Sequence, residues 1–575
     1  MIKNSFIAEA AFILGEEKRK LPKMFLIFLL SASLDLFGLG LIAPYIALAI
    51  NPDYLFESWI WNSLQNYRVE VSFSEVIIGL GILLILVAVL KAFMGIAVTS
   101  TIIKFSQYQQ VRVRLLLMEA YQNNSYENYI RRNSSEYVYS IQILANEFSK
   151  IIKITLQTTV DLTVGFLMLI FLLYQDPTSV LIVFFILIIL LFFYDKFFKT
   201  RLKQAGQLVN KSSAKMIQSL NEAVDGYKEI RILSVGSFFK NKLEKETTTL
   251  AREVGLNEII SHIPKFILEA LAICMLSSMV LLAFLNEKDI ESTLPILGLY
   301  GFAALRLFPV FKNIGTTINQ YRYMRNGVSL LKNDLTIVLN NKNEKLKKVE
   351  NQFHIDEFNQ IELNKINYTY PSVNKQVLYN LSLKIKSGET IGIIGKSGAG
   401  KTTLIDVLLG LLEPTKGFIK INNLDIKEHR NEWQSKVGII PQDIFLIDDT
   451  LENNIILGKS LNKEKLEESI NFAKLSSLIH ELPDGLSSNI GERGIKFSGG
   501  QRQRVVLARM FYHGRKFLIM DEATSALDSE TEKEVLANLK SIAGKVTLVI
   551  ISHRASFLKH CDRIYNINNG TIKIS

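Results

Sequence analysis

Residues 395–403 read GKSGAGKTT, and this stretch decides the fold of the second half of the chain. Phosphate oxygens are bound by converging backbone N–H groups, and a side chain at the tightest points of such a loop would block their approach. Gly395, Gly398 and Gly400 leave that space open. Lys401 follows at the spacing that reaches the β and γ phosphates. The stretch therefore predicts a phosphate-binding loop (P-loop) between a strand and a helix.

The whole loop is expected to contact a nucleotide, ATP or GTP, and the preceding run ETIGII is expected to be its buried strand. A helix that opens at Thr403 directs the positive end of its dipole at the phosphates, and the Thr402 hydroxyl is a ligand for Mg²⁺. The predicted nucleotide contacts are Gly395, Lys396, Ser397, Gly398, Ala399, Gly400, Lys401, Thr402 and Thr403.

A second strand signal, FLIMDE at residues 517–522, ends in two carboxylates. Ligands of open α/β sheets gather at the carboxyl ends of strands. Asp521 suits the Mg²⁺ shell. Glu522 is placed to polarise the attacking water, because adjacent strand residues point to different sides. The alternative is an ordinary buried strand that ends in a polar turn.

Between these motifs lies FSGGQ at residues 497–501, which resembles the signature of ATP-binding cassette (ABC) proteins. Phe497 departs from the leucine usual in that family, but the phosphate-facing residues are intact. The resemblance implies that ATP is also bound in trans, from a second chain, by Ser498, Gly499, Gly500 and Gln501.

Further ABC motifs follow in the family's order. By this resemblance Tyr370 stacks on adenine, Gln442 is the catalytic Q-loop glutamine and a Mg²⁺ ligand, and His553 is the catalytic switch histidine. SALD at residues 525–528 resembles the D-loop, and SNIGERG at 488–494 resembles the stretch that precedes the signature in exporters. A strand aromatic at Tyr370 and a polar strand end at His553 are the plainer interpretations.

The first half of the chain is predicted to cross a membrane. A continuous apolar helix of about 20 residues spans a bilayer, and six such segments precede residue 320: 24–50, 73–97, 155–174, 178–197, 258–285 and 293–312. The first is too long for a signal peptide and is expected to remain in the membrane. The predicted fold class is a six-span α-helical ABC exporter domain followed by an α/β P-loop NTPase domain with a helical subdomain.

Lysine and arginine placement predicts the orientation, because basic residues resist translocation. The N-terminal segment and the long loops near 100–154 and 198–257 are basic, so we expect them in the cytosol, with segment 51–72 outside. Both termini are then cytosolic. The long loops are expected to continue the helices and to turn over in short coupling helices near 131–140 and 225–233.

We expect a membrane domain at 1–340, a linker at 341–360 and an ATP-binding cassette at 361–575. The 575-residue chain has a formal net charge of +11, which is spread over the predicted cytosolic parts. That distribution favours positive-inside topology over nucleic-acid binding. Cys274 and Cys561 fall in separate domains and predict neither a disulfide framework nor a metal site.

Only one nucleotide domain is found in the chain, so the ABC resemblance implies a homodimer with two composite ATP sites, each with a Glu522. A heterodimer is the alternative, although heterodimers of this family usually carry one degraded site. Closure of the nucleotide domains on ATP would reach the membrane half through the coupling helices.

Charged residues within or beside the predicted spans are costly in lipid and point to the cargo. Lys91, Lys265, Arg306 and Lys312 are placed toward the inner half of the bilayer, where a basic cavity suits a phosphate-bearing cargo. The alternative is that the charges of the spans pair with one another; the acidic candidates are Asp35, Asp161 and Glu269.

The outer segment carries Phe56, Trp59, Ile60 and Leu64, which predict a short amphipathic helix on the outer surface. A folded extracellular cap is the alternative. With PKFILE at 264–269 and ALRLFPVFKNI at 304–314, this segment resembles the lipid-linked oligosaccharide flippases of bacterial protein glycosylation.

That resemblance implies an ATP- and Mg²⁺-dependent flippase of the bacterial inner membrane that moves a polyprenyl-pyrophosphate-linked glycan from the cytoplasmic to the outer leaflet. An exporter of lipid A, phospholipid or hydrophobic drugs is one alternative. A peptide exporter and a channel-like regulator gated by ATP are others.

Overall fold

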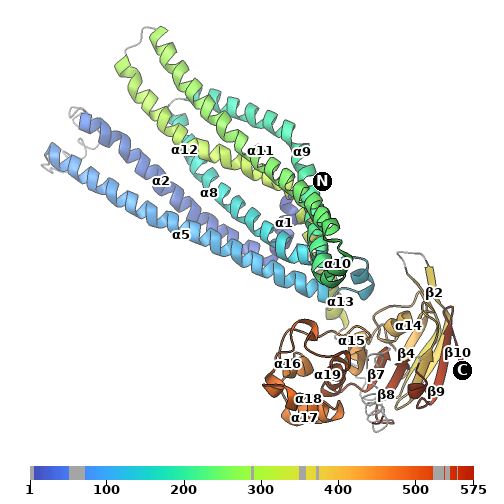
Figure 1. The fold of residues 1–575 in the computed structure, drawn as a ribbon. Helices are drawn as coiled ribbons and strands as arrows, with labels where there is room; N and C mark the ends of the chain where they lie inside the picture. The colour runs from blue at the N-terminus through green and yellow to red at the C-terminus, as the bar shows by residue number, and fades with distance from the viewer. Residues whose placement is uncertain are drawn as a thin grey trace. The chain divides into compact units, whose positions relative to one another are not determined.

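A computed structural model describes residues 6–50, 72–175, 177–285, 290–348, 358–370, 375–521, 537, 544–552 and 554–575. The chain divides into two compact units (Figure 1). The first unit, Met1–Asn124 with Arg132–Lys347, is helical. The second unit, Ser125–Arg131 with Lys348–Ser575, contains every strand in the described part of the chain.

Long helices make up most of the first unit: α2 (Leu21–Ile50), α5 (Phe73–Gln122), α8 (Ala145–Gln175), α9 (Pro177–Asp225), α11 (Gly236–Leu285) and α12 (Ile290–Tyr323). Shorter helices are α1 (Phe6–Leu14), α7 (Ser134–Tyr139) and α10 (Tyr227–Leu233), and α13 (Arg325–Lys348) follows α12. Each segment predicted to span the membrane falls within one of the long helices.

Helix α5 extends well past the membrane span that the sequence predicts for it. Ser72 and Glu75 form a capping box at its start, with the Ser72 N–H donating to Glu75 Oε2 at 2.8 Å. The helix then continues for 50 residues, which is about 75 Å, whereas the hydrocarbon core of a bilayer is about 30 Å thick. It therefore extends well beyond a bilayer, as expected for helices that continue into a long loop.

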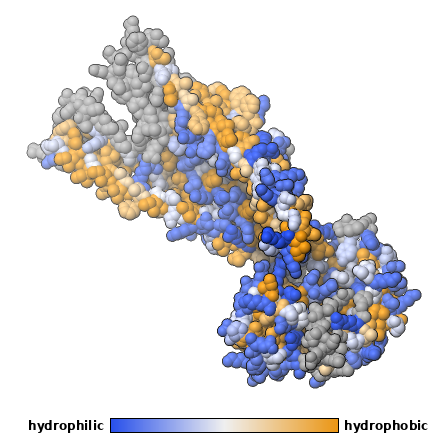
Figure 2. Space-filling model, in the orientation of Figure 1, coloured by the Kyte–Doolittle hydropathy of each residue, from blue (hydrophilic) through white to orange (hydrophobic). Residues whose placement is uncertain are grey.

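Three segments of the described chain are long and apolar enough to cross a membrane: Phe6–Gly38, Phe73–Gln122 and Ser134–Phe171. Hydrophobic side chains gather on the exposed surface of the long helices (Figure 2). Soluble proteins rarely expose so large an apolar surface, whereas lipid covers it in a membrane protein. The total of six spans stays a prediction.

Helices α8 and α12 are joined by polar contacts between residues 155–161 and 313–321. The hydroxyls of Thr158 and Thr317 lie 2.6 Å apart, and those of Thr155 and Tyr321 lie 2.8 Å apart. These bonds connect the two helices through buried or half-buried hydroxyl groups.

The second unit is built on two sheets. The antiparallel sheet has the order β2-β1-β4-β5, made of β1 (Gln360–Tyr370), β2 (Lys375–Lys386), β4 (Lys416–Ile421) and β5 (Leu424–Asp425). The other sheet has the order β10-β9-β3-β8-β7-β6, made of β3 (Thr390–Ile394), β6 (Val437–Ile440), β7 (Phe517–Asp521), β8 (Thr547–Ile551), β9 (Arg563–Asn568) and β10 (Thr571–Ile574). Strands β3, β6, β7, β8 and β9 are parallel, so their carboxyl ends share one edge.

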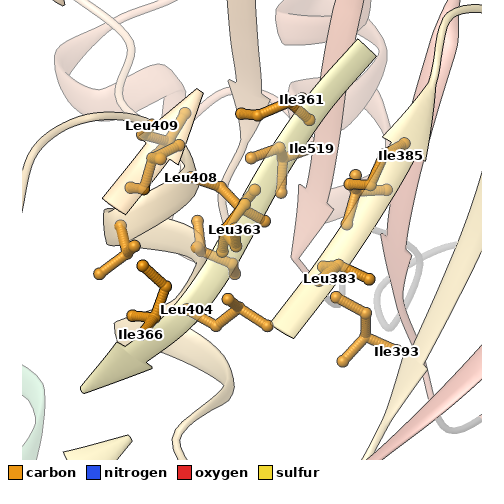
Figure 3. Packing of buried hydrophobic residues seen from close by; sticks show 14 of the residues in the cluster. Ile361, Leu363, Ile366, Leu383, Ile385, Ile393, Leu404, Leu408, Leu409 and Ile519 are labelled. Atoms are coloured by element: carbon orange, nitrogen blue, oxygen red, sulfur yellow. The ribbon is translucent and has the colours of Figure 1, made fainter. Parts of the chain in front are cut away.

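Helix α14 (Lys401–Leu408) packs in the core with strands of both sheets. Leu404 and Leu408 lie there with Leu363 of β1 and Leu383 of β2, and Ile519 of β7 belongs to the same cluster (Figure 3). This core fixes the helix that follows the P-loop.

A second core lies under the remaining helices of this unit. They include α16 (Leu451–Ile456), α17 (Lys463–Phe472), α18 (Ser476–Glu481) and α19 (Gly499–Tyr512). Helix α15 (Arg430–Lys436) leads into β6, α21 (Ala555–Leu558) follows β8, and α6 (Tyr126–Ile130) adds Tyr126 to the edge of the first core. The predicted α/β domain with helical elements is therefore present.

Candidate functional site

The P-loop follows β3 and turns into α14 with glycines at its two tightest points. A Cβ on Gly395 would meet the Ile567 carbonyl oxygen at 2.5 Å, and a Cβ on Gly400 would meet Leu378 at 3.1 Å. Gly398 and Gly400 have φ angles of +77° and +104°, which favour glycine. The predicted loop therefore has a backbone that favours glycine at these positions.

Side chains of the loop divide into buried anchors and exposed groups. Ala399 and Thr403 are buried, whereas Lys396, Ser397 and Thr402 are exposed. Exposed backbone and hydroxyl groups at the start of a helix are available to an anion.

Two further contacts organise the loop. The Lys401 Nζ donates to the Gly395 carbonyl at 2.8 Å, which holds the cation over the loop. The Tyr370 hydroxyl lies 3.2 Å from the Thr403 hydroxyl, so the end of β1 adjoins the first turn of α14. The structure thus brings Tyr370 to the P-loop, while its stacking on adenine stays a prediction.

Asp521 ends β7 at the same sheet edge as the P-loop. It acts electrostatically on Asp406 of α14: burial, and then the charge of Asp521, raise the pKa of Asp406 to about 6. A carboxyl held near a second carboxylate in this way is common in ligand sites. The sequence motifs did not mark Asp406, since it lies inside a helix and belongs to no recognised motif.

The signature segment begins α19 with a capping box. The Gln501 N–H donates to the Ser498 hydroxyl at 3.3 Å, and the Ser498 N–H donates to the Gln501 side chain at 2.8 Å. Gly499 and Gly500 form the first turn. Phe497 is 6% exposed and belongs to the second core, so the phenylalanine is accommodated beneath an intact helix start.

Arg509 links this helix to the segment that follows Gln442. It is buried and donates to the carbonyls of Asn454 at 2.8 Å and Phe445 at 3.0 Å. Burial lowers its pKa to about 10, so it remains a cation. Sequence reasoning missed this residue, because its acceptors lie more than 50 positions away.

Gln442 is exposed just after β6 and lines a groove of about 440 Å³. The groove also includes Arg493 from the predicted pre-signature stretch and Gly499 from the signature. Three motifs that are separate in sequence therefore meet on one surface of this unit.

Several predicted positions lie outside the described residues. They are the catalytic candidates Glu522 and His553, the D-loop stretch 525–528, and the outer-helix residues Phe56, Trp59, Ile60 and Leu64. Strands β7 and β8 nevertheless end immediately before Glu522 and two residues before His553, at the P-loop edge of the sheet.

Three of the charged residues singled out in the predicted spans have partners on neighbouring helices. Lys91 of α5 forms an ion pair with Asp35 of α2. Asp161 of α8 accepts a hydrogen bond from the Asn313 amide at 2.6 Å. For Lys91 and Asp35 the structure has the charge pairing that the sequence left open as an alternative, whereas the partner of Asp161 is a neutral amide.

The remaining cavity candidates lie on α11 and α12. Lys265 is 3.6 Å from Glu269 on the same helix, with both side chains about half exposed. Lys312 is half-buried and makes no ion pair with any residue that the structure describes. Arg306 lies in α12, and its side chain is outside the described part.

The predicted coupling helices can also be placed. The second is α10, Tyr227–Leu233, within the predicted range. The first predicted range contains α7, but the short helix at the turn of the loop is α6, which ends just before that range. Helix α6 contains the aromatic residues Tyr126 and Tyr129, which the sequence pattern of the long polar loop did not single out.

Two family models match the chain, one for each half. The model of the ABC transporter transmembrane region matches residues 25–291, and the ABC transporter model of the nucleotide domain matches residues 378–525. The chain is an ABC transporter with a transmembrane region and an ATP-binding domain.

Among its relatives, the ATP-dependent lipid A-core flippase of Coxiella burnetii is 28% identical over 442 residues, which cover 76% of this chain and 73% of the relative. Lipid A-core flippase 2 of Colwellia psychrerythraea is 27% identical over 76% of this chain and 74% of its own length. A bacterial Atm1-family ABC exporter with ATP bound shares the fold, with a TM-score of 0.75, 18% identity, and coverage of 96% of this chain and 94% of that one. The protein is therefore a membrane-embedded ABC exporter whose domain binds ATP, and the family implies ATP hydrolysis.

Proposed function

We propose that this exporter is an ATP-driven flippase for a lipid with a pyrophosphate head group, namely a polyprenyl-pyrophosphate-linked oligosaccharide. The cargo would move from the cytoplasmic to the outer leaflet of a bacterial inner membrane. The observation that carries this proposal is the set of basic residues on two adjoining helices of the membrane unit, combined with a complete P-loop in the nucleotide unit.

The basic residues lie close along α11 and α12. A Cβ on Gly315 of α12 would lie 3.4 Å from Pro264 of α11, so the helices approach closely there. Lys265 is the next residue of α11, and Lys312 is about one turn from Gly315, about 4.5 Å along the helix. These two lysines, with Arg306 on the same helix as Lys312, suit a doubly charged phosphate group, for which Lys265 would exchange its half-exposed partner Glu269.

ATP is proposed to be held by the P-loop residues 395–403 and by Tyr370, with Ser498, Gly499, Gly500 and Gln501 acting from a second copy. Glu522 would polarise the water, while His553 and Gln442 would sense the γ-phosphate. A homodimer supplies both halves of each site. The nucleotide domains and both termini would then be cytosolic.

Magnesium is proposed as the metal. The Thr402 hydroxyl is exposed at the P-loop and Asp521 ends β7, so the donors are the hard oxygens that Mg²⁺ prefers. Burial, and then repulsion by Asp521, raise the pKa of Asp406, and a cation at this edge would relieve that repulsion. When bound, Mg²⁺ neutralises charge on the phosphates; Gln442 completes the proposed ligand set.

Lipid A is a second candidate cargo, favoured by relatives that carry the name lipid A-core flippase. Stimulation of ATP hydrolysis separates the candidates. In nanodiscs the polyprenyl-pyrophosphate glycan should raise the hydrolysis rate more than lipid A or a polyprenol without pyrophosphate. Lys312→Gln should weaken this stimulation, while Lys150→Gln, at an exposed lysine of α8, should not. Equal stimulation by the phosphate-free lipid would refute the proposed cargo.

A further inference from the structure

One buried carboxylate, that of Asp334 on α13, gathers two side chains from distant parts of the first unit. The Tyr121 hydroxyl donates to its Oδ2 at 2.5 Å. Arg132 Nη1 donates to both oxygens, at 2.9 and 3.1 Å. Asp334 is only 7% exposed, and it lies more than 200 positions from both partners in sequence.

Arg132 is the centre of the cluster. Its Nε donates to Glu136 at 2.9 Å and its Nη2 to the Ser140 hydroxyl at 3.2 Å, both at or beside α7. Its guanidinium also lies over the Tyr137 ring, 4.8 Å from the centroid. A planar cation with this many satisfied donors is held in one orientation.

The backbone crosses between the two units at three places, and two members of the cluster lie within four residues of the first two crossings along the chain. Tyr121 is in the last turn of α5, four residues before the segment Ser125–Arg131 that belongs to the second unit, and Arg132 is the first residue after that segment. Asp334 is on α13, the helix whose end at Lys348 begins the rest of the second unit. One carboxylate therefore ties both ends of the α6 segment to the helix of the third crossing.

We propose that Tyr121, Arg132 and Asp334 are positioning residues that make these three crossings move as one body. Displacement of α6 and of the chain after Lys348 then reaches α5, α7 and α13 together. This inference rests on the proposed function in one respect, that nucleotide binding drives movement in the membrane helices. It does not depend on the identity of the cargo.

Single and double substitutions distinguish a positioning role of these residues from a role in stability alone. Removal of one partner leaves a buried charge unpaired, so a single substitution destabilises the fold; replacement of both partners by apolar side chains is often neutral. The double variant R132M/D334L therefore should restore stability while lacking the hydrogen bonds that fix orientation.

The test uses the full-length protein in nanodiscs with both cysteines removed (C274S/C561S). A cysteine at Ile78, a 60% exposed residue near the start of α5, carries an environment-sensitive fluorophore. We measure its response to ATP with vanadate, the ATP hydrolysis rate without cargo, and the melting temperature. K150M is the matched control, since it removes the exposed pair between Lys150 and Glu147.

The parent should respond, and K150M should respond like the parent. Y121F, D334N and R132M/D334L should retain ATP hydrolysis but lose about five-fold or more of the response. The double variant R132M/D334L should show this reduced fluorescence response while its melting temperature stays near that of the parent. Full response in the double variant, recovered along with stability, would overturn the proposal; so would an unresponsive parent. Failure of the proposed cargo would leave this test unaffected, because no lipid substrate enters it.

Discussion

At the residue scale, two glycines with similar backbone angles allow the effect of backbone strain to be separated from the effect of blocking the phosphate site. Gly398 and Gly458 have φ angles of +77° and +80°, and a Cβ at either would meet no atom within 4 Å. Alanine at each should cost a similar amount of stability, about 1–2 kcal/mol. Only Gly398→Ala should abolish ATP binding, because only that Cβ enters the proposed phosphate site.

Binding of a fluorescent ATP analogue and the melting temperature of each variant check this pair. Tight binding by Gly398→Ala would show that the loop does not hold the phosphates. If Gly458→Ala also lost ATP binding, backbone strain alone would explain the loss of binding in Gly398→Ala.

Phe497 offers a second residue-scale prediction. Because the side chain is buried in the second core, Phe497→Leu should lower the free energy of unfolding by about 1 kcal/mol. ATP hydrolysis should stay close to the wild-type rate, since the capping box of Ser498 and Gln501 does not involve the ring. Denaturant unfolding and a steady-state hydrolysis assay test this; a large fall in hydrolysis at unchanged stability would contradict it.

At the scale of elements, the strands and helices that carry the motifs were predictable, because their signals are local. The run before Gly395 is strand β3, FLIMD is β7, and the predicted membrane spans fall in helices. Polar residues that connect distant segments of the chain were not predictable. Arg509, Asp406 and Asp334 act on residues that only the tertiary fold brings near, and no local pattern marks them.

Arg509 tests how α19 is fixed to the Gln442 segment. Arg509→Met would leave the carbonyls of Asn454 and Phe445 without their buried donor, so stability should fall by about 2–3 kcal/mol. The control is Arg430→Met, which removes a partly exposed ion pair with Glu413 and should cost less than about 1 kcal/mol. Unfolding of the purified variants by denaturant gives both values, and equal costs would refute a special role for Arg509.

At the scale of the whole molecule, two features define the function: a unit whose parallel strand ends assemble the nucleotide motifs, and a unit of helices longer than a bilayer is thick. Their combination in one chain agrees with the two ABC transporter family models that match it. The cargo was not predictable to the same degree, because the sequence places the intramembrane charges without their partners. Lys91 proved to be paired with Asp35, and Lys265 lies 3.6 Å from Glu269, so Arg306 and Lys312 are the cavity candidates for which the structure describes no acidic partner.

The most direct test of the account is lipid translocation in proteoliposomes. A labelled polyprenyl-pyrophosphate oligosaccharide is placed in the leaflet facing the nucleotide domains, and its protection from an added glycan-cleaving enzyme is followed with and without ATP. If the protein flips this lipid, protection should depend on ATP and should be lost with Glu522→Gln. Protection should also be weaker for the same glycan on a polyprenol lacking pyrophosphate. ATP hydrolysis without protection, or preferential movement of lipid A in the same assay, would contradict it.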